Sequence, residues 1–155
     1  MKNNQPVTQK EYVVRQDCAI ISHTDASGNI TYVNDDFVEY AGFERPELIG
    51  KPHNIIRHPD MPKEAFRDMW ATLKSGRAWQ GIVKNRRANG DHYWVKATAT
   101  PLPDGGYMSV RLKATAQEIS SPAVCAYSNR QPRQAFWWLS LIRVLCAFYP
   151  FLPRY

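Results

Sequence analysis

The sequence predicts an α+β domain in which a five-stranded antiparallel sheet carries helices packed on one face. Two of the supporting observations are β-hairpin signals: strand-like runs flank the turn at residues 25–29, and a second pair flanks the Asn89-Gly90 turn. The third is the stretch between these hairpins, where apolar residues recur at helical spacing. One more strand-like run, residues 107–114, follows the second hairpin. The expected order of elements is therefore β-β-α-α-α-β-β-β.

The first half of the chain predicts short elements. Residues 18–25 and 29–34 are strand-like, and the turn between them is rich in residues that tolerate positive φ. Residues 35–43 place apolar side chains at helical spacing and predict a helix that stops at Gly42. Residues 45–51 predict another short helical turn, which ends at Gly50.

The longest predicted helix spans roughly residues 62–75, with Gly76 just past its end. Its apolar stripe consists of Ala65, Phe66, Met69, Trp70 and Leu73. We expect this stripe, including Trp70, to belong to the core. From residue 79 the period changes to two, and residues 79–87 and 92–100 become the strands of the second hairpin.

The length of 155 residues corresponds to one domain with some chain left over. We expect an N-terminal cap or arm over 1–17, a folded domain over 18–119 and an atypical hydrophobic tail over 120–155. The tail lacks Lys, Asp and Glu, and residues 135–152 are nearly long enough to cross a bilayer. Arg143 opposes such a span, so a membrane-inserted, an interfacial and an altered C-terminal segment all remain open.

The formal net charge of +6 does not predict nucleic-acid binding. Residues 1–118 hold all 14 acids and 16 of the 20 Lys and Arg, which leaves +2 for this part. Lys84, Arg86 and Arg87 alternate along a predicted strand, a pattern typical of a solvated sheet face. Three cysteines without CxxC spacing and a polar start without a signal peptide predict a cytoplasmic setting, at the inner face of the membrane if the tail associates with it.

Residues 53–62, HNIIRHPDMP, concentrate ionisable side chains. His53, His58 and Asp60 offer three metal ligands, but the chain lacks HExxH or paired-cysteine spacing, and a structural zinc takes four ligands. No serine or cysteine occupies a nucleophile-like turn, so we expect no catalytic triad. Asp60 precedes Met61-Pro62 and is a good N-cap for the following helix. Arg57 and His58 are left for another role, and a guanidinium pairs bidentately with phosphate or carboxylate.

Several motifs give the chain a resemblance to PAS sensor domains. They are SGNITYVN at 27–34, the pattern F-x4-G-F-x3-E-L-I-G over 37–50, and NRRANGDHYW at 85–94. The long stretch through 51–95 resembles, more narrowly, the N-terminal PAS domains of bacterial aerotaxis receptors. The resemblance covers residues 1 to about 119 and implies a PAS fold, in agreement with the predicted sheet and helices.

This resemblance implies a non-enzymatic sensory domain that binds FAD non-covalently and reports redox or oxygen status for aerotaxis-type signal transduction. It further implies a homodimer that signals through a HAMP-type chemoreceptor module absent from this chain, with membrane association through the tail left open. Two alternatives remain. One is a haem-binding PAS oxygen sensor with His58 or His92 as axial ligand. The other is a cofactor-free PAS interaction module that dimerises through its sheet.

The expected cofactor-binding residues are Asn34, Arg57, His58, Asp60, Trp79 and Asn85. The resemblance implies that residues 53–62 serve FAD. The Asn85 amide can both donate to and accept from a flavin ring edge. Related light sensors use two asparagines there, of which one matches Asn85 while Val95 stands at the other position. Those sensors also carry a reactive cysteine where residues 53–57 have none, so we expect no covalent photoadduct.

Trp79 and Asn34 keep two interpretations each. Trp79 begins a strand after the long helix, where its indole would flank a pocket and either stack on a cofactor or simply pack. Asn34 closes the second strand beside two aspartates, as a helix N-cap or as a residue near the cofactor. His92 alternates with Tyr93 in the hairpin, which is typical of a surface position.

Overall fold

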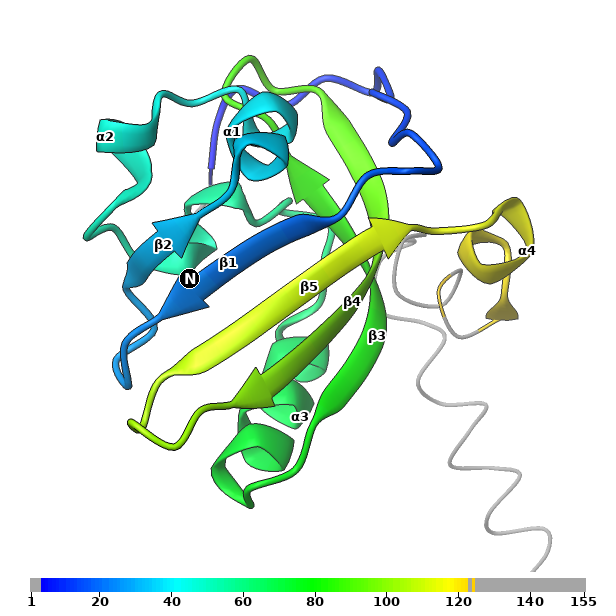
Figure 1. The fold of residues 1–155 in the computed structure, drawn as a ribbon. Coiled ribbons are helices and arrows are strands. Elements are labelled where there is room, and N and C mark those ends of the chain that lie inside the picture. Colours follow the sequence, from blue (N-terminus) through cyan, green and yellow to red (C-terminus); the bar gives the residue numbers. More distant parts are fainter. Residues whose placement is uncertain (1–3, 123, 125–155) are drawn as a thin grey trace, which may run out of the picture.

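The computed structural model describes residues 4–122 and 124, and its element order confirms the predicted one. The strands are β1 (Ile20–Thr24), β2 (Ile30–Val33), β3 (Trp79–Arg86), β4 (His92–Pro101) and β5 (Tyr107–Lys113). The helices are α1 (Asp35–Ala41), α2 (Arg45–Leu48), the 3₁₀ helix η1 (His53–Ile56), α3 (Lys63–Lys74) and α4 (Ala116–Ile119). The sequence did not predict η1 and α4, each of which is only four residues long. Figure 1 shows the arrangement.

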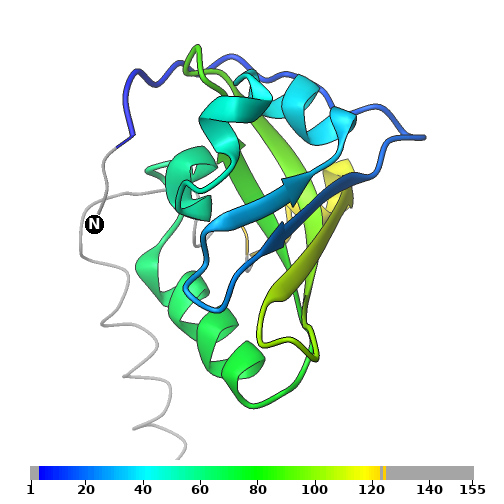
Figure 2. The ribbon, with the colours of Figure 1, turned by 60° about the vertical axis from the view of Figure 1, so that its left-hand side comes forward.

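The five strands form one antiparallel sheet in the order β2-β1-β5-β4-β3. The last strand, β5, therefore lies in the middle and joins the two hairpins. The helices α1, α2 and α3 lie on one face of this sheet (Figures 1 and 2). The predicted class, an α+β fold with helices on one face of a five-stranded antiparallel sheet, is confirmed.

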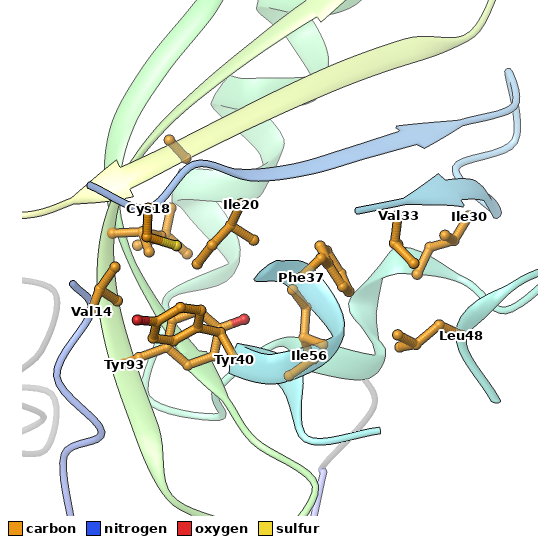
Figure 3. Packing of buried hydrophobic residues seen from close by; sticks show 14 of the residues in the cluster. Val14, Cys18, Ile20, Ile30, Val33, Phe37, Tyr40, Leu48, Ile56 and Tyr93 are labelled. Atoms are coloured by element: carbon orange, nitrogen blue, oxygen red, sulfur yellow. The ribbon is translucent and has the colours of Figure 1, made fainter. Parts of the chain in front are cut away.

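The core lies between α1, α2 and the sheet. Tyr40 of α1 packs beside Tyr93 of β4, with their ring centroids 5.9 Å apart (Figure 3). Phe37 and Leu48 are fully buried in the same core, and burial of one such side chain stabilises the fold by about 1.5–3 kcal/mol. As predicted, α1 ends at Gly42, whose left-handed φ of 68° lets its N–H reach the Val38 carbonyl.

The N-terminal segment runs along the β3–β4 hairpin. The Thr8 N–H donates to the Gly90 carbonyl at 2.8 Å, and the Tyr12 N–H donates to the His92 carbonyl at 2.7 Å. Two sequence predictions about this hairpin are wrong. Lys84 and Arg86, expected on a solvated face, are 6% and 5% exposed, and His92, expected at the surface, is buried too. Arg86 donates to the Pro6 carbonyl, so the segment supplies the acceptor that water would otherwise provide.

The start of α3 differs from the prediction. The N-cap position is Pro62, without a side-chain hydrogen bond, and Asp60 does not cap the helix. Its carboxylate instead accepts from the buried Lys84 ammonium at 2.9 Å. Trp70, predicted in the core, is only half-buried, because much of the apolar stripe of α3 faces a cavity and not the sheet.

The predicted hydrophobic segment at 135–152 lies outside the described residues. Within residues 4–122 and 124, no helix is both long and apolar enough to cross a membrane. The predicted division into arm, domain and tail stays a prediction.

Candidate functional site

A cavity of about 380 Å³ lies between α3, η1 and the sheet. This volume falls within the range of about 300–1,000 Å³ that is typical of small-molecule pockets. One wall is apolar and aromatic, with Phe66, Met69 and Trp70 from α3 and Ile56 from η1. The sheet supplies small side chains such as Ala97 and polar ones from three of its strands. A flat aromatic ligand with a polar edge matches such a lining.

Three of the six predicted site residues line this cavity: Arg57, Trp79 and Asn85. Trp79 stands at the start of β3, and its indole N–H donates to the Asp68 carboxylate of α3 at 2.9 Å. Asn85 is buried near the end of β3. Its side-chain Nδ2 has no hydrogen-bond partner among the described residues. A buried donor without a partner is costly, so this amide is suited to a ligand acceptor.

Arg57 follows η1 and is held against the cavity wall. Its guanidinium lies over the Phe66 ring, 3.7 Å from the centroid, and donates to the Met61 carbonyl at 3.2 Å. A backbone bridge joins Arg57 to Asn85, which fixes the end of η1 on β3. This backbone bridge therefore fixes the positions of the two predicted residues relative to each other.

The other predicted residues lie outside the lining. Asn34 caps α1: its Oδ1 accepts from the Phe37 N–H at 3.1 Å and the Ile21 N–H at 2.9 Å, and its Nδ2 donates to the Ala19 carbonyl at 2.7 Å. These three bonds join β1, β2 and α1. Of the two interpretations offered by the sequence, the N-cap describes what Asn34 does in the structure.

His58 and Asp60 belong to a polar cluster that also contains the buried Lys84 and His92. His58 Nδ1 accepts from the Asp60 backbone N–H at 3.1 Å, which places the ring proton on Nε2. Burial and the nearby Lys84 ammonium lower the pKa of His58 to about 4, against the opposing effect of Asp60. The ring is therefore neutral at pH 7, and the cluster holds the loop between η1 and α3 on β3.

The sequence did not predict a second polar group in the cavity. Ser22 of β1, His53 of η1 and Arg111 of β5 all line it. Arg111 donates to Ser22 Oγ at 3.1 Å and lies 2.7 Å from His53 Nε2. A period of two is visible only for Ser22, which occupies a buried position of β1 that alternates with more exposed ones, whereas Arg111 is the single buried position of β5. The sequence indicates His53 individually only as a candidate metal ligand, and otherwise as part of residues 53–62.

A family model described as "PAS fold" matches residues 30–116, which is more than half of the chain. The chain belongs to the PAS family. Across 125 residues it is 51% identical to the aerotaxis receptor of Escherichia coli K12, a match that covers 78% of this chain and 25% of the receptor. It is 32% identical over 90 residues to a nitrogen fixation regulatory protein of Klebsiella pneumoniae, covering 58% of this chain and 18% of that protein.

Solved PAS-type structures share the fold at low sequence identity. The light-state structure of the Aureochrome1 LOV domain matches with a TM-score of 0.58 and 19% identity, covering 63% of this chain and 83% of that one. The structure "Flavin Analogue Sheds Light on Light-Oxygen-Voltage Domain Mechanism" matches with a TM-score of 0.57 and 20% identity, covering 70% and 82%. The chain spans a quarter or less of the two curated relatives named above.

Proposed function

We propose that this PAS domain binds FAD non-covalently in the cavity and reports redox or oxygen status for aerotaxis-type signalling. The observation that carries the proposal is the cavity itself, with an aromatic wall on α3 and unsatisfied or cationic polar groups on the sheet side. The 51% identity to an aerotaxis receptor supports the signalling role. One of the structural neighbours is named for a flavin analogue, which supports the class of cofactor.

The residues present fit a flavin. An isoalloxazine ring needs apolar or aromatic walls and a set of donors and acceptors at its pyrimidine edge. Phe66 and Trp79 supply aromatic surface, and the Asn85 Nδ2 supplies a donor. Arg57 and Arg111 supply guanidinium groups for carbonyl or phosphate oxygens. Within the described residues the cysteine is Cys18, which is buried in the core and does not line the cavity, so the proposed chemistry is redox change and not a thiol adduct.

When bound, the flavin supplies a reversible change of charge and protonation at its ring nitrogens. Asn85 responds because its amide donates or accepts according to what the ring edge offers. Asn85 pairs with Tyr93 across β3 and β4, and β4 pairs with the central β5. A changed hydrogen bond at Asn85 therefore shifts the balance between two arrangements of the sheet. Only a difference in interaction between the two redox states drives this shift.

The output partner in this proposal is a HAMP-type chemoreceptor module, and the sensing unit is a homodimer. The setting is cytoplasmic, at the inner face of the membrane if residues 120–155 associate with it. No reaction on a substrate is required, so the domain is a receptor and not an enzyme.

The visible spectrum of the purified protein tests the cofactor. We expect the absorption bands of an oxidised flavin, bleaching with dithionite, and FAD in the supernatant after heat denaturation. A haem Soret band would replace the proposal by the haem alternative, although His58 and His92 lie outside the cavity lining. Protein that stays colourless after FAD is added would favour the interaction module and end the proposal.

Matched variants test the site. Asn85→Ser and Trp79→Ala should each weaken FAD binding at least tenfold, measured by quenching of flavin fluorescence. Gln80→Ser removes a side-chain amide from the same strand, but Gln80 is exposed and pairs with Thr98. It should bind FAD like the parent. If both cavity variants also bind like the parent, the assigned site is wrong.

A further inference from the structure

Arg111 is a buried cation that has no acidic partner among the described residues. It lies in the central strand β5, is 5% exposed and lines the cavity. Within residues 4–122 and 124, no carboxylate oxygen lies within 4 Å of its guanidinium nitrogens. Buried charges in proteins are normally paired, because an uncompensated one is strongly unfavourable. Lys84, another buried cation of the sheet, forms such a pair with Asp60.

The neighbours of Arg111 hold it in place without neutralising it. Its guanidinium donates to Ser22 Oγ at 3.1 Å and to His53 Nε2 at 2.7 Å. Because arginine only donates, His53 Nε2 accepts and the ring proton lies on Nδ1. Burial and the Arg111 charge keep the pKa of His53 well below its usual value, so this histidine is neutral.

The nearby aromatic groups supply no negative charge either. Burial raises the pKa of Tyr93 to about 12, so its phenol stays protonated at pH 7. The Phe37 ring centroid lies 5.6 Å from the Arg111 guanidinium carbon and offers a cation–π contact only. Burial lowers the pKa of Arg111 to about 10, which still leaves it charged at pH 7. The cavity therefore contains a fixed, oriented positive charge.

We propose that Arg111, held by Ser22 and His53, is the counter-charge for negative charge on the occupant of the cavity, which is the ring of the reduced flavin. This inference rests on the proposed function. Electrons from a reductant in solution enter the ring and fewer protons follow, so the ring gains net negative charge. Arg111 keeps its proton and forms the ion pair that it lacks with the part of the chain that the structure describes. The oxidised, neutral ring takes only hydrogen bonds from the same group, so Arg111 favours the reduced state.

The first test uses the unmodified flavin-loaded protein. Its midpoint potential is measured against pH from 6 to 9 by reduction with dithionite in the presence of a redox indicator dye. One proton taken up per electron gives a slope of about 59 mV per pH unit, since 59 mV is a tenfold change for one electron. We expect a clearly smaller slope. A full slope across this range would overturn the proposal without affecting flavin binding.

The second test compares Arg111→Gln with Arg111→Lys, which retains the charge. In Arg111→Gln the preference of the flavin for the reduced state should fall at least tenfold, which lowers the midpoint potential by about 59 mV for a one-electron couple. This potential should also depend more strongly on pH than that of the parent. Arg111→Lys should keep most of the parent potential. Arg86→Gln is the matched control, because Arg86 is also a buried arginine of the sheet but does not line the cavity.

The outcomes separate the two proposals. Flavin-loaded Arg111→Gln with an unchanged potential contradicts the role of Arg111 and leaves the flavin proposal intact. Unmodified protein without flavin defeats both proposals. If Arg111→Gln fails to hold flavin while Arg111→Lys holds it, the requirement for charge is supported. If neither variant folds, a full slope in the unmodified protein still contradicts the proposal.

Discussion

The Lys84 ammonium of β3 lies 2.9 Å from the Asp60 carboxylate, although the lysine side chain is only 7% exposed. Asp60 comes from the loop between η1 and α3, so this pair joins the cavity's helical wall to its sheet. The same carboxylate oxygen lies 3.4 Å from Nδ1 of the fully buried His58. Because that nitrogen accepts from the Asp60 backbone N–H, the contact with His58 is not an ion pair at neutral pH. Asp60 is thus placed to support the site through Lys84.

Asp60→Asn should destabilise the domain by about 1–3 kcal/mol, because a neutral amide replaces the carboxylate that compensates the buried Lys84 charge. Urea unfolding of the flavin-free protein measures the change. Asp35→Asn is the control: Asp35 pairs with Arg45 at the surface, where an ion pair contributes about 0–1 kcal/mol. A second change, Lys84→Met, should restore much of the loss. Equal effects of Asp60→Asn and Asp35→Asn would contradict the assigned role.

Acid should destabilise the domain through His58. Its folded-state pKa is about 4, below the ordinary histidine value of 6.5, so between these values the unfolded chain binds a proton that the folded one does not. Stability is therefore fully present above about pH 6.5 and falls as the pH drops toward 4, by up to about 3 kcal/mol. His92, whose pKa is also lowered by burial and Lys84, adds in the same direction.

Urea unfolding at pH 7 and pH 5 measures this dependence. His58→Gln keeps a polar group near Asp60 but cannot take up the proton, so its stability should change less between the two pH values than that of the parent. An unaltered difference in His58→Gln would assign the acid sensitivity to other groups.

The fold could be predicted from the sequence because its signals are local. Asn89-Gly90 marks the second hairpin, and the stripe that includes Phe66 and Leu73 marks α3. The predicted order and the helices on one face follow from such patterns. The short helix η1 escaped prediction because four residues after Pro52 contain too little periodicity to show a helix.

The site could be predicted only in part. Arg57, Trp79 and Asn85 line the cavity. The sequence indicates Arg57 through the polar stretch at residues 53–62, and it indicates Trp79 and Asn85 through the strand that follows the long helix. Arg111 could not be found in this way, because its partners Ser22 and His53 are far from it in the sequence and meet only when β5 inserts beside β1. The burial of Arg86 on β3 likewise depends on the N-terminal segment, whose Pro6 carbonyl accepts from its guanidinium and which has no periodic pattern of its own.

Asn34 provides a test of cap against cofactor roles. Asn34→Ala removes three hydrogen bonds that join β1, β2 and α1, which should cost about 2–4 kcal/mol. Asn34→Asp keeps the acceptor for the Phe37 and Ile21 N–H groups but loses the donor to Ala19, so its loss should be intermediate. Thermal unfolding of the parent, Asn34→Asp and Asn34→Ala measures this order of stability. FAD affinity of the folded Asn34→Asp protein should match the parent, and a large loss would show a cofactor role after all.

Gly90 and Gly105 form a matched pair for the N-terminal segment. Both have positive φ, +94° and +87°, so alanine strains the backbone at either position by about 1–2 kcal/mol. A Cβ on Gly90 would lie 2.8 Å from the Pro6 carbonyl oxygen, whereas a Cβ on Gly105 would meet nothing within 4 Å. Gly90→Ala should therefore destabilise the domain more than Gly105→Ala, and the excess measures the docking of the segment.

Limited proteolysis completes this comparison. In Gly90→Ala the displaced segment should lose its bond from the Thr8 N–H to the Gly90 carbonyl, so cleavage within residues 4–17 should become faster than in Gly105→Ala. Loss of the segment would also expose Arg86, whose guanidinium donates to the Pro6 carbonyl, and such an opening adds to the cost. If the two variants are equally stable and equally resistant, the segment contributes nothing to the fold and its hydrogen bonds merely replace those to water.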